Sequence, residues 1–175
     1  MLNFGYIPVF ALRFMVLYFI VTNAIAMALF PGGTLFNPQL EIYSFSENFF
    51  SDLGITFTKD GTQNYLSSFL FNSSLLVLGL CAVTHIFVPK LFKDSKKSYI
   101  LSIIAATLFV IAGLSFIGVG LTPADIYFEE HVWFVIFAFN AQTMGVLFMT
   151  IAFLLSKISN KYTIVAFIYF ITVAL

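Results

Sequence analysis

The sequence predicts an all-α integral membrane bundle with four complete spans and a partial fifth. Of its 175 residues, 61% are hydrophobic and 9% are charged, whereas a soluble domain is roughly 45–50% apolar and about 25% charged. A chain of this length buries only about 70% of its surface on folding, so a large apolar area would be left facing water. The apolar residues also form long runs. Lipid is therefore the expected solvent.

Four apolar runs are long enough to cross about 30 Å of hydrocarbon, which takes roughly 20 helical residues. They cover residues 7–30, 66–88, 99–121 and 132–155. A fifth run, 163–175, is too short by the same criterion, and we interpret it as the start of a spanning helix. The chain is then either a truncated six-helix bundle or one that ends early. Because no linker divides it, we expect residues 1–175 to form one transmembrane domain.

Charged residues segregate between alternate connections. Basic residues lie near the start of the first span, between the second and third, and after the fourth: Arg13, Lys90, Lys93, Lys96, Lys97, Lys157 and Lys161. The other connections carry Glu41, Glu47, Asp52, Asp60, Asp125, Glu129 and Glu130, together with Lys59. Because basic loops stay on the cytoplasmic side, we expect a cytoplasmic amino terminus in the cell (plasma) membrane and outward-facing acidic loops.

The outer loop, residues 31–65, is long enough to carry structure of its own. Within it, Ser46 is placed as a helix N-cap and Gly54 as a C-terminal stop. Phe45, Phe49, Phe50 and Leu53 recur between them at helical spacing. The pattern predicts a short interfacial helix over residues 46–53, with its aromatic face in the head-group layer.

Polar residues in and beside the spans form a candidate site. Asn64, Ser68 and Asn72 make a stripe at i, i+4 and i+8, while Glu129 and Asn140 lie nearly three helical turns apart. We expect an outward-facing polar cleft built from Asp52, Asn64, Asn72, Asp125, Glu129, His131 and Asn140. The structural alternatives are interhelical hydrogen bonding by the amides and helix capping by the acidic residues.

The chemistry of this cleft has several candidates. Carboxylates with one imidazole could bind a metal ion, relay protons or hold a cationic head group, and the metal candidates are Asp125, Glu129 and His131. Their spacing matches no specific metal motif, and the sequence leaves any cofactor unknown. Ala106, Gly113 and Gly120, seven residues apart, predict a helix-packing seam instead of a site.

Three functional classes remain open. The first is binding of a lipid head group or small ligand, the second a membrane-embedded lipid-modifying enzyme using Asp/Glu/His acid–base or metal chemistry, and the third an ion or small-solute carrier. Carriers usually place charged or broken-helix sites at mid-membrane, whereas here the deep groups are neutral amides. A zero net charge without a basic tract disfavours nucleic acid as a partner. The expected partners are membrane lipid and either another copy or the missing sixth helix.

Two motifs carry a resemblance to a known family. Ser51-Asp52-Leu53-Gly54, and Pro123-x-Asp125 with His131 six residues on, resemble an uncharacterised prokaryotic multipass membrane family, a domain of unknown function usually with about six helices. That family is distantly similar to membrane proteins associated with lipid-anchor remodelling and autophagy. The resemblance extends over residues 37–148, and Val132 stands where family members often have Asn. It implies a six-helix architecture.

Overall fold

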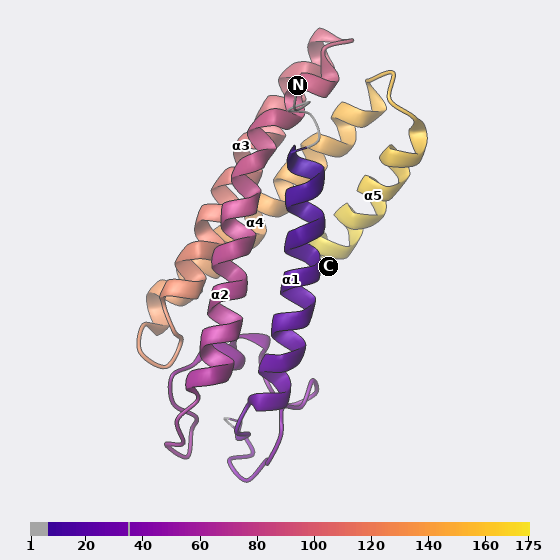
Figure 1. Ribbon diagram of the computed structural model, residues 1–175. Coiled ribbons are helices and arrows are strands. Elements are labelled where there is room, and N and C mark those ends of the chain that lie inside the picture. Colours follow the sequence, from indigo (N-terminus) through magenta and orange to yellow (C-terminus); the bar gives the residue numbers. More distant parts are fainter. Residues whose placement is uncertain (1–6, 35) are drawn as a thin grey trace. The chain divides into compact units, whose positions relative to one another are not determined.

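The computed structural model describes residues 7–34 and 36–175, and they fold as helices joined by loops (Figure 1). The elements are α1 (Ile7–Leu29), the 3-10 helix η2 (Phe50–Gly54), α2 (Tyr65–Ala82), the 3-10 helix η3 (Val83–Phe92), α3 (Lys96–Leu121), α4 (Phe128–Leu154) and α5 (Asn160–Ala174). Within the described ranges the only extended pairing is an isolated bridge between Phe57 and Gln63. The predicted all-α class is confirmed.

Four helical stretches are long and apolar enough to cross a membrane. They are Ile7–Leu29, Tyr65–Phe92, Lys96–Leu121 and Phe128–Leu154, with mean hydropathies of 1.9, 2.0, 2.6 and 1.7. α5 is apolar but has only 15 residues. The four predicted spans and the shorter fifth helix are therefore present.

The fourth span begins earlier than the sequence pattern predicts. α4 starts at Phe128 instead of residue 132, so Glu129, Glu130 and His131 belong to its first turn. A turn in which the amides of Ile126 and Tyr127 donate to the Pro123 carbonyl precedes the helix. Acidic side chains at a helix N-terminus are favoured by the helix dipole, so Glu129 and Glu130 stabilise this early start.

Contacts within the chain group it into two compact units, whose boundaries fall inside α1, α2, α3 and α4. We call residues 14–78 and 116–135 the loop unit, because they contain the long loop between α1 and α2. Residues 7–13, 79–115 and 136–175 form the lysine unit, which contains η3, α5 and the greater part of α3 and α4. Each unit is described by itself.

The lysine unit has a small apolar core. Phe92, Ala105, Met149 and Ala152 are buried together, and the hydroxyl of Ser98 donates to the Ala152 carbonyl at 2.8 Å. Tyr169 of α5 accepts a hydrogen bond from Gln142 of α4. Small residues and one interhelical bond thus bring α3 and α4 together, and a second polar contact attaches α5.

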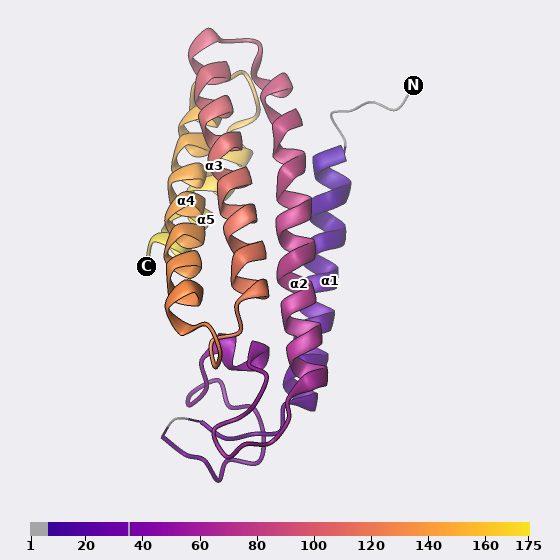
Figure 2. The same ribbon diagram turned by 90° about the vertical axis from the view of Figure 1, so that its left-hand side faces the viewer.

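In the loop unit, α1 and α2 run side by side (Figures 1 and 2). Tyr18 Oη and Ser73 Oγ are 3.2 Å apart, and Asn23 Nδ2 donates to Ser74 Oγ at 3.0 Å. Because lipid is as apolar as the helices, the hydrophobic effect does not drive helices together inside it, and interhelical hydrogen bonds with close packing must do so. These two bonds fasten α1 to α2.

The predicted short helix over residues 46–53 is present only in part, as the 3-10 helix η2, which begins at Phe50 and ends at the predicted stop, Gly54. A turn closed by the Asn48 amide on the Ser44 carbonyl, at 2.8 Å, is followed by the single short helix η2. Asn48 Oδ1 accepts from the Ser44 amide and its Nδ2 donates to the Gly33 carbonyl. Asn side chains that bond nearby backbone compete with helix formation, and this replaces the α-helix that the aromatic spacing suggested. Ser46 caps nothing and pairs instead with the Ser44 hydroxyl.

The predicted small-residue seam on α3 is confirmed in both units. Ala106 is buried. A Cβ added at Gly113 would press against the Ala82 Cβ and lie 3.0 Å from the Gly79 carbonyl oxygen, and one added at Gly120 would lie 2.9 Å from the Asn72 carbonyl oxygen. Only glycine allows the α2 backbone this close.

Gly113→Ala should therefore destabilise the protein by about 1–3 kcal/mol through overpacking. This cost must exceed the gain of about 1 kcal/mol that Ala brings to a helix interior. Reversible unfolding in mixed micelles would measure it. Gly145→Ala is the matched control, because its Cβ would meet only side-chain atoms, at 3.1 Å from Phe109 and 3.3 Å from Leu108. Equal stability of the two variants would contradict the conclusion that Gly113 is needed for the close packing of α2 on α3.

Candidate functional site

Residues 53–57 run from the end of η2 to the bridge at Phe57, and we call them the central segment of the loop unit. Asn64 is 2% exposed, and its Nδ2 donates to the carbonyls of Leu53 and Ile55, at 3.1 and 2.9 Å. Ser67 Oγ also donates to the Leu53 carbonyl, at 3.1 Å. An irregular segment has no ladder to satisfy its carbonyls. The start of α2 supplies the missing donors.

The next turn of α2 satisfies Gly54 in the same way. Ser68 Oγ and Asn72 Nδ2 both donate to the Gly54 carbonyl, at 2.9 and 3.0 Å. A Cβ at Gly54 would lie 2.6 Å from Phe71 and 2.8 Å from Asn72 Oδ1, so a larger residue would push the segment off the helix. The polar stripe predicted from Asn64, Ser68 and Asn72 is real, and it faces a loop backbone instead of another helix.

Asp125 holds the same segment through its amides. Both oxygens of its carboxylate lie 3.0 Å from the Thr56 amide nitrogen, and Oδ2 also accepts from the Phe57 amide at 3.0 Å. Hydrogen bonds to an ionised acceptor are stronger than neutral ones. Asp125 therefore ties the α3–α4 connection to the loop, and Figure 2 shows this connection next to η2.

Asp52 has different partners. Its Oδ2 accepts from the Phe49 amide at 3.0 Å and from Asn48 Nδ2 at 3.1 Å, which closes the first turn of η2. Across the described residues, no hydrogen bond joins Asp52 to Asp125 or to His131. Each carboxylate thus stabilises its own part of the loop.

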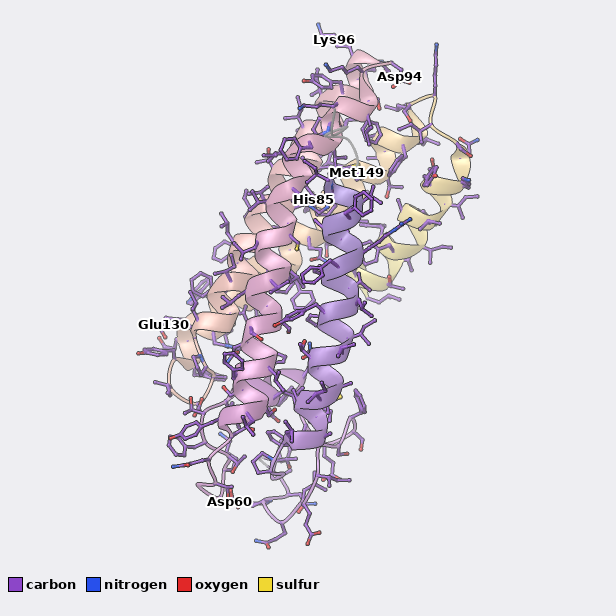
Figure 3. The ribbon with its side chains drawn as sticks, in the orientation of Figure 1. Asp60, His85, Asp94, Lys96, Glu130 and Met149 are labelled. Atoms are coloured by element: carbon purple, nitrogen blue, oxygen red, sulfur yellow. The ribbon has the colours of Figure 1, made fainter. Side chains whose placement is uncertain are left out.

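A short hairpin follows the central segment. Asp60, labelled in Figure 3, accepts from the hydroxyls of Thr58 and Thr62 and from the Thr62 amide. These bonds favour the ionised carboxylate and lower the pKa of Asp60. Gly61 takes a φ of 86° at the tip, where a side chain would be strained.

His131 has a ring nitrogen that no described residue contacts by a hydrogen bond. The ring is 6% exposed, and Nδ1 lies 2.7 Å from the Thr122 carbonyl oxygen. Because a carbonyl only accepts, Nδ1 must carry the proton, and in the neutral ring Nε2 is then a bare acceptor. Nε2 is buried and has no partner among the residues that the structure describes.

Two further buried acceptors lack partners in the described part of the loop unit: Asn64 Oδ1 and Asn23 Oδ1. The Nδ2 of Asn64 faces two carbonyls, and that of Asn23 faces the Phe19 carbonyl and Ser74 Oγ. These partners fix which atom of each amide is oxygen. All three unpartnered atoms, including His131 Nε2, therefore call for a hydrogen-bond donor.

The structure distributes the sequence-predicted site residues unevenly. Asn64, Asn72 and Asp125 act on one segment, and Asp52 stands immediately before it. Glu129 is exposed in the first turn of α4. Asn140 lies in the lysine unit, exposed, with its Nδ2 on the Ile136 carbonyl at 2.8 Å.

The described ranges contain no group of three His, Cys, Asp or Glu side chains that could hold an ion, so Asp125, Glu129 and His131 are not brought together as such a group. Asn23 was missed by the sequence reasoning, although a lone amide within an apolar run is itself a signal. Ser67, one turn from Asn64, was also passed over.

Comparison of the chain with protein-family models, curated proteins and solved structures gives no match. The family resemblance inferred from the motifs therefore stays a prediction.

Removing the Asp125 carboxylate should loosen the loop without unfolding the helices. Asp125→Ala leaves the Thr56 and Phe57 amides without their acceptor, and because the site is exposed we expect a loss of about 1 kcal/mol. Hydrogen exchange at residues 55–58 should accelerate, and Asp125→Asn, which keeps one acceptor oxygen, should show a smaller change. Glu129→Ala, an exposed carboxylate one turn away, is the control. Unchanged hydrogen exchange at residues 55–58 in Asp125→Ala would show that Asp125 does not hold this segment in place.

Proposed function

We propose that this chain is a multipass membrane protein whose loop unit binds a hydrogen-bond-donating lipid head group or similar small ligand at the membrane surface. The observation that carries the proposal is the set of buried acceptors, His131 Nε2, Asn64 Oδ1 and Asn23 Oδ1, that have no partner among the described residues. The four apolar helices supply the membrane setting.

The energetics of buried polar groups favour a bound donor. A buried acceptor left without a partner costs about 1–3 kcal/mol, and this one small unit has three. A hydroxyl or primary ammonium would satisfy them, whereas a deprotonated phosphate offers only acceptors of its own. Ordered water could also donate, and the experiment below separates water from a ligand.

The depth of two of these acceptors suits a head group. Asn64 directly precedes α2, and His131 is the fourth residue of α4. Asn23 lies six residues before the end of α1, which is about 9 Å at 1.5 Å per residue. Head groups and the interface occupy the outermost part of a bilayer about 40–45 Å thick overall. By these positions Asn64 and His131 are at the depth of this layer, and Asn23 lies below it.

A membrane-embedded enzyme is the second candidate, and the geometry of His131 favours it specifically. An imidazole with Nδ1–H fixed on a carbonyl and a bare Nε2 is arranged as a general base. Such a base would take a proton from a hydroxyl or water of the same donor-bearing ligand. Turnover of a bound lipid, lost in His131→Asn, would distinguish the enzyme from a binding protein.

The alternation of charges supports a plasma-membrane orientation with a cytoplasmic amino terminus and the loop end outside. In a Cys81→Ser background, a cysteine at Lys59 should react with an impermeant maleimide on intact cells, whereas one at Lys97 should react only after permeabilisation. Cys81 is the only native cysteine, so the background is clean. The opposite labelling pattern would reverse the orientation and place the site inside.

The ligand proposal is tested with two zwitterionic lipids, of which only one has N–H hydrogen-bond donors in its head group. Phosphatidylethanolamine carries ammonium N–H groups and phosphatidylcholine carries none. We expect phosphatidylethanolamine to be retained preferentially in native mass spectrometry. His131→Asn keeps an N–H for the Thr122 carbonyl but removes Nε2, so it should weaken that preference by about two- to tenfold.

His85→Asn is the matched control, because His85 Nδ1 likewise lies 2.9 Å from a backbone carbonyl, that of Ala82, but in the lysine unit. It should leave the lipid preference intact. Equal retention of the two lipids by the unsubstituted protein, or no effect of His131→Asn, would leave water as the donor and defeat the proposal.

A further inference from the structure

Lysines are concentrated at one end of the lysine unit. Six exposed lysines lie in residues 90–97 and 156–161: Lys90, Lys93, Lys96, Lys97, Lys157 and Lys161. The only acidic residue in these two stretches is Asp94. The two stretches therefore carry a local excess of five positive charges, six lysines less one aspartate.

Contacts within the unit bring the two stretches together. Asp94 Oδ2 accepts from the Lys157 backbone amide at 2.6 Å, and the rings of Phe92 and Phe153 have centroids 5.1 Å apart. Figure 3 shows Asp94 and Lys96 at the same end, with Met149 farther along the helices. The one local carboxylate thus accepts a hydrogen bond from backbone, and the two lysine-bearing stretches lie together at what we call the lysine end.

Three of the lysines occupy positions that the helix dipole disfavours. Lys96 and Lys97 begin α3, and Lys161 is the second residue of α5. Neither helix has an acidic residue in its first turn, whereas α4 has Glu129 and Glu130. A helix N-terminus carries partial positive charge and attracts anions. The preference for basic residues in cytoplasmic loops explains lysines near this end. It does not explain their position inside first turns that contain no acidic residue.

Apolar side chains border the lysine end. Leu91, Ile100 and Tyr162 are each about half exposed, at 52%, 47% and 50%. Lys161 Nζ lies 5.2 Å from the centroid of the Tyr162 ring, so charge and apolar surface are in direct contact. A ligand that fits both features has a phosphate group attached to an acyl chain.

We propose that the lysine end binds the phosphate group of an anionic phospholipid, with its acyl chain along the bordering apolar residues. This site belongs to the lysine unit and is separate from the site proposed for the loop unit. Its ligand is an anionic hydrogen-bond acceptor, whereas the ligand of the loop unit is a hydrogen-bond donor. The bound phosphate accepts hydrogen bonds from lysine ammonium groups and neutralises the unfavourable charge at the α3 and α5 N-termini. Each lysine near such a lipid contributes roughly fivefold in affinity.

The experiment compares the full chain with Lys96→Gln/Lys97→Gln/Lys161→Gln in nanodiscs of phosphatidylcholine alone or with phosphatidylglycerol. In phosphatidylcholine the triple variant should be at least as thermally stable as the unsubstituted protein, because the like-charge repulsion at the helix ends is gone. With phosphatidylglycerol the order should reverse. Lipid retention in native mass spectrometry should fall roughly a hundredfold for the three lysines together.

Two controls isolate the cause. The triple Lys→Arg variant keeps the charges and should keep phosphatidylglycerol, and Lys59→Gln, in the loop unit, should change nothing. Equal retention of phosphatidylglycerol by the unsubstituted protein and the Lys→Gln variant would overturn the proposal. So would equal stabilisation by inorganic phosphate at the same concentration, since that would show a site for free anions instead of lipid. A failed phosphatidylethanolamine test at His131 would leave this result untouched.

Discussion

The loop unit depends on one constraint, which is that irregular backbone beside a bilayer must have its polar groups satisfied by the protein. Segment 53–57 has its carbonyls bonded by side chains of α2 and its amides bonded by Asp125. Because these donors and acceptors come from two different parts of the chain, the segment joins α2 to the α3–α4 connection. The same contacts use every Asn64 donor, which is why its oxygen remains available.

The sequence predicts structural features that depend on neighbouring residues, and it misses hydrogen bonds that depend on distant residues. Span lengths follow from local hydropathy, and the Asn64, Ser68 and Asn72 stripe follows from helical periodicity. The partner of Asp125 is 69 residues away and has no local signature. The extent of the short loop helix was mispredicted, because the aromatic spacing does not show two local hydrogen bonds. Asn48 accepts from the Ser44 amide, and Asp52 accepts from the Phe49 amide. Likewise, the free nitrogen of His131 is visible only once Thr122 is seen to hold the other one.

The two proposed sites need opposite kinds of partner: the first needs a hydrogen-bond donor, and the second needs an anion. Among the described residues of the loop unit, the unpartnered atoms are acceptors, and Asp52, Asp60 and Asp125 accept from backbone amides. In the lysine unit the surplus is of cations at helix N-termini. In the two proposals, the first environment would favour hydrogen-bond donors over phosphate, and the second would attract phosphate. The proposed chemistry of each site therefore follows from the groups that lack partners there. Unpartnered acceptors need donors, and lysines in excess of carboxylates need anions.

The two polar contacts between α1 and α2 bear on how the protein is assembled. Ser73 and Ser74 are consecutive, so their side chains point about 100° apart around α2, and they engage Tyr18 and Asn23 of α1. A shift of α1 by one turn, about 5.4 Å, or a rotation about its axis breaks both contacts and leaves an amide in hydrocarbon. The two contacts therefore specify both the register and the rotation of α1 against α2.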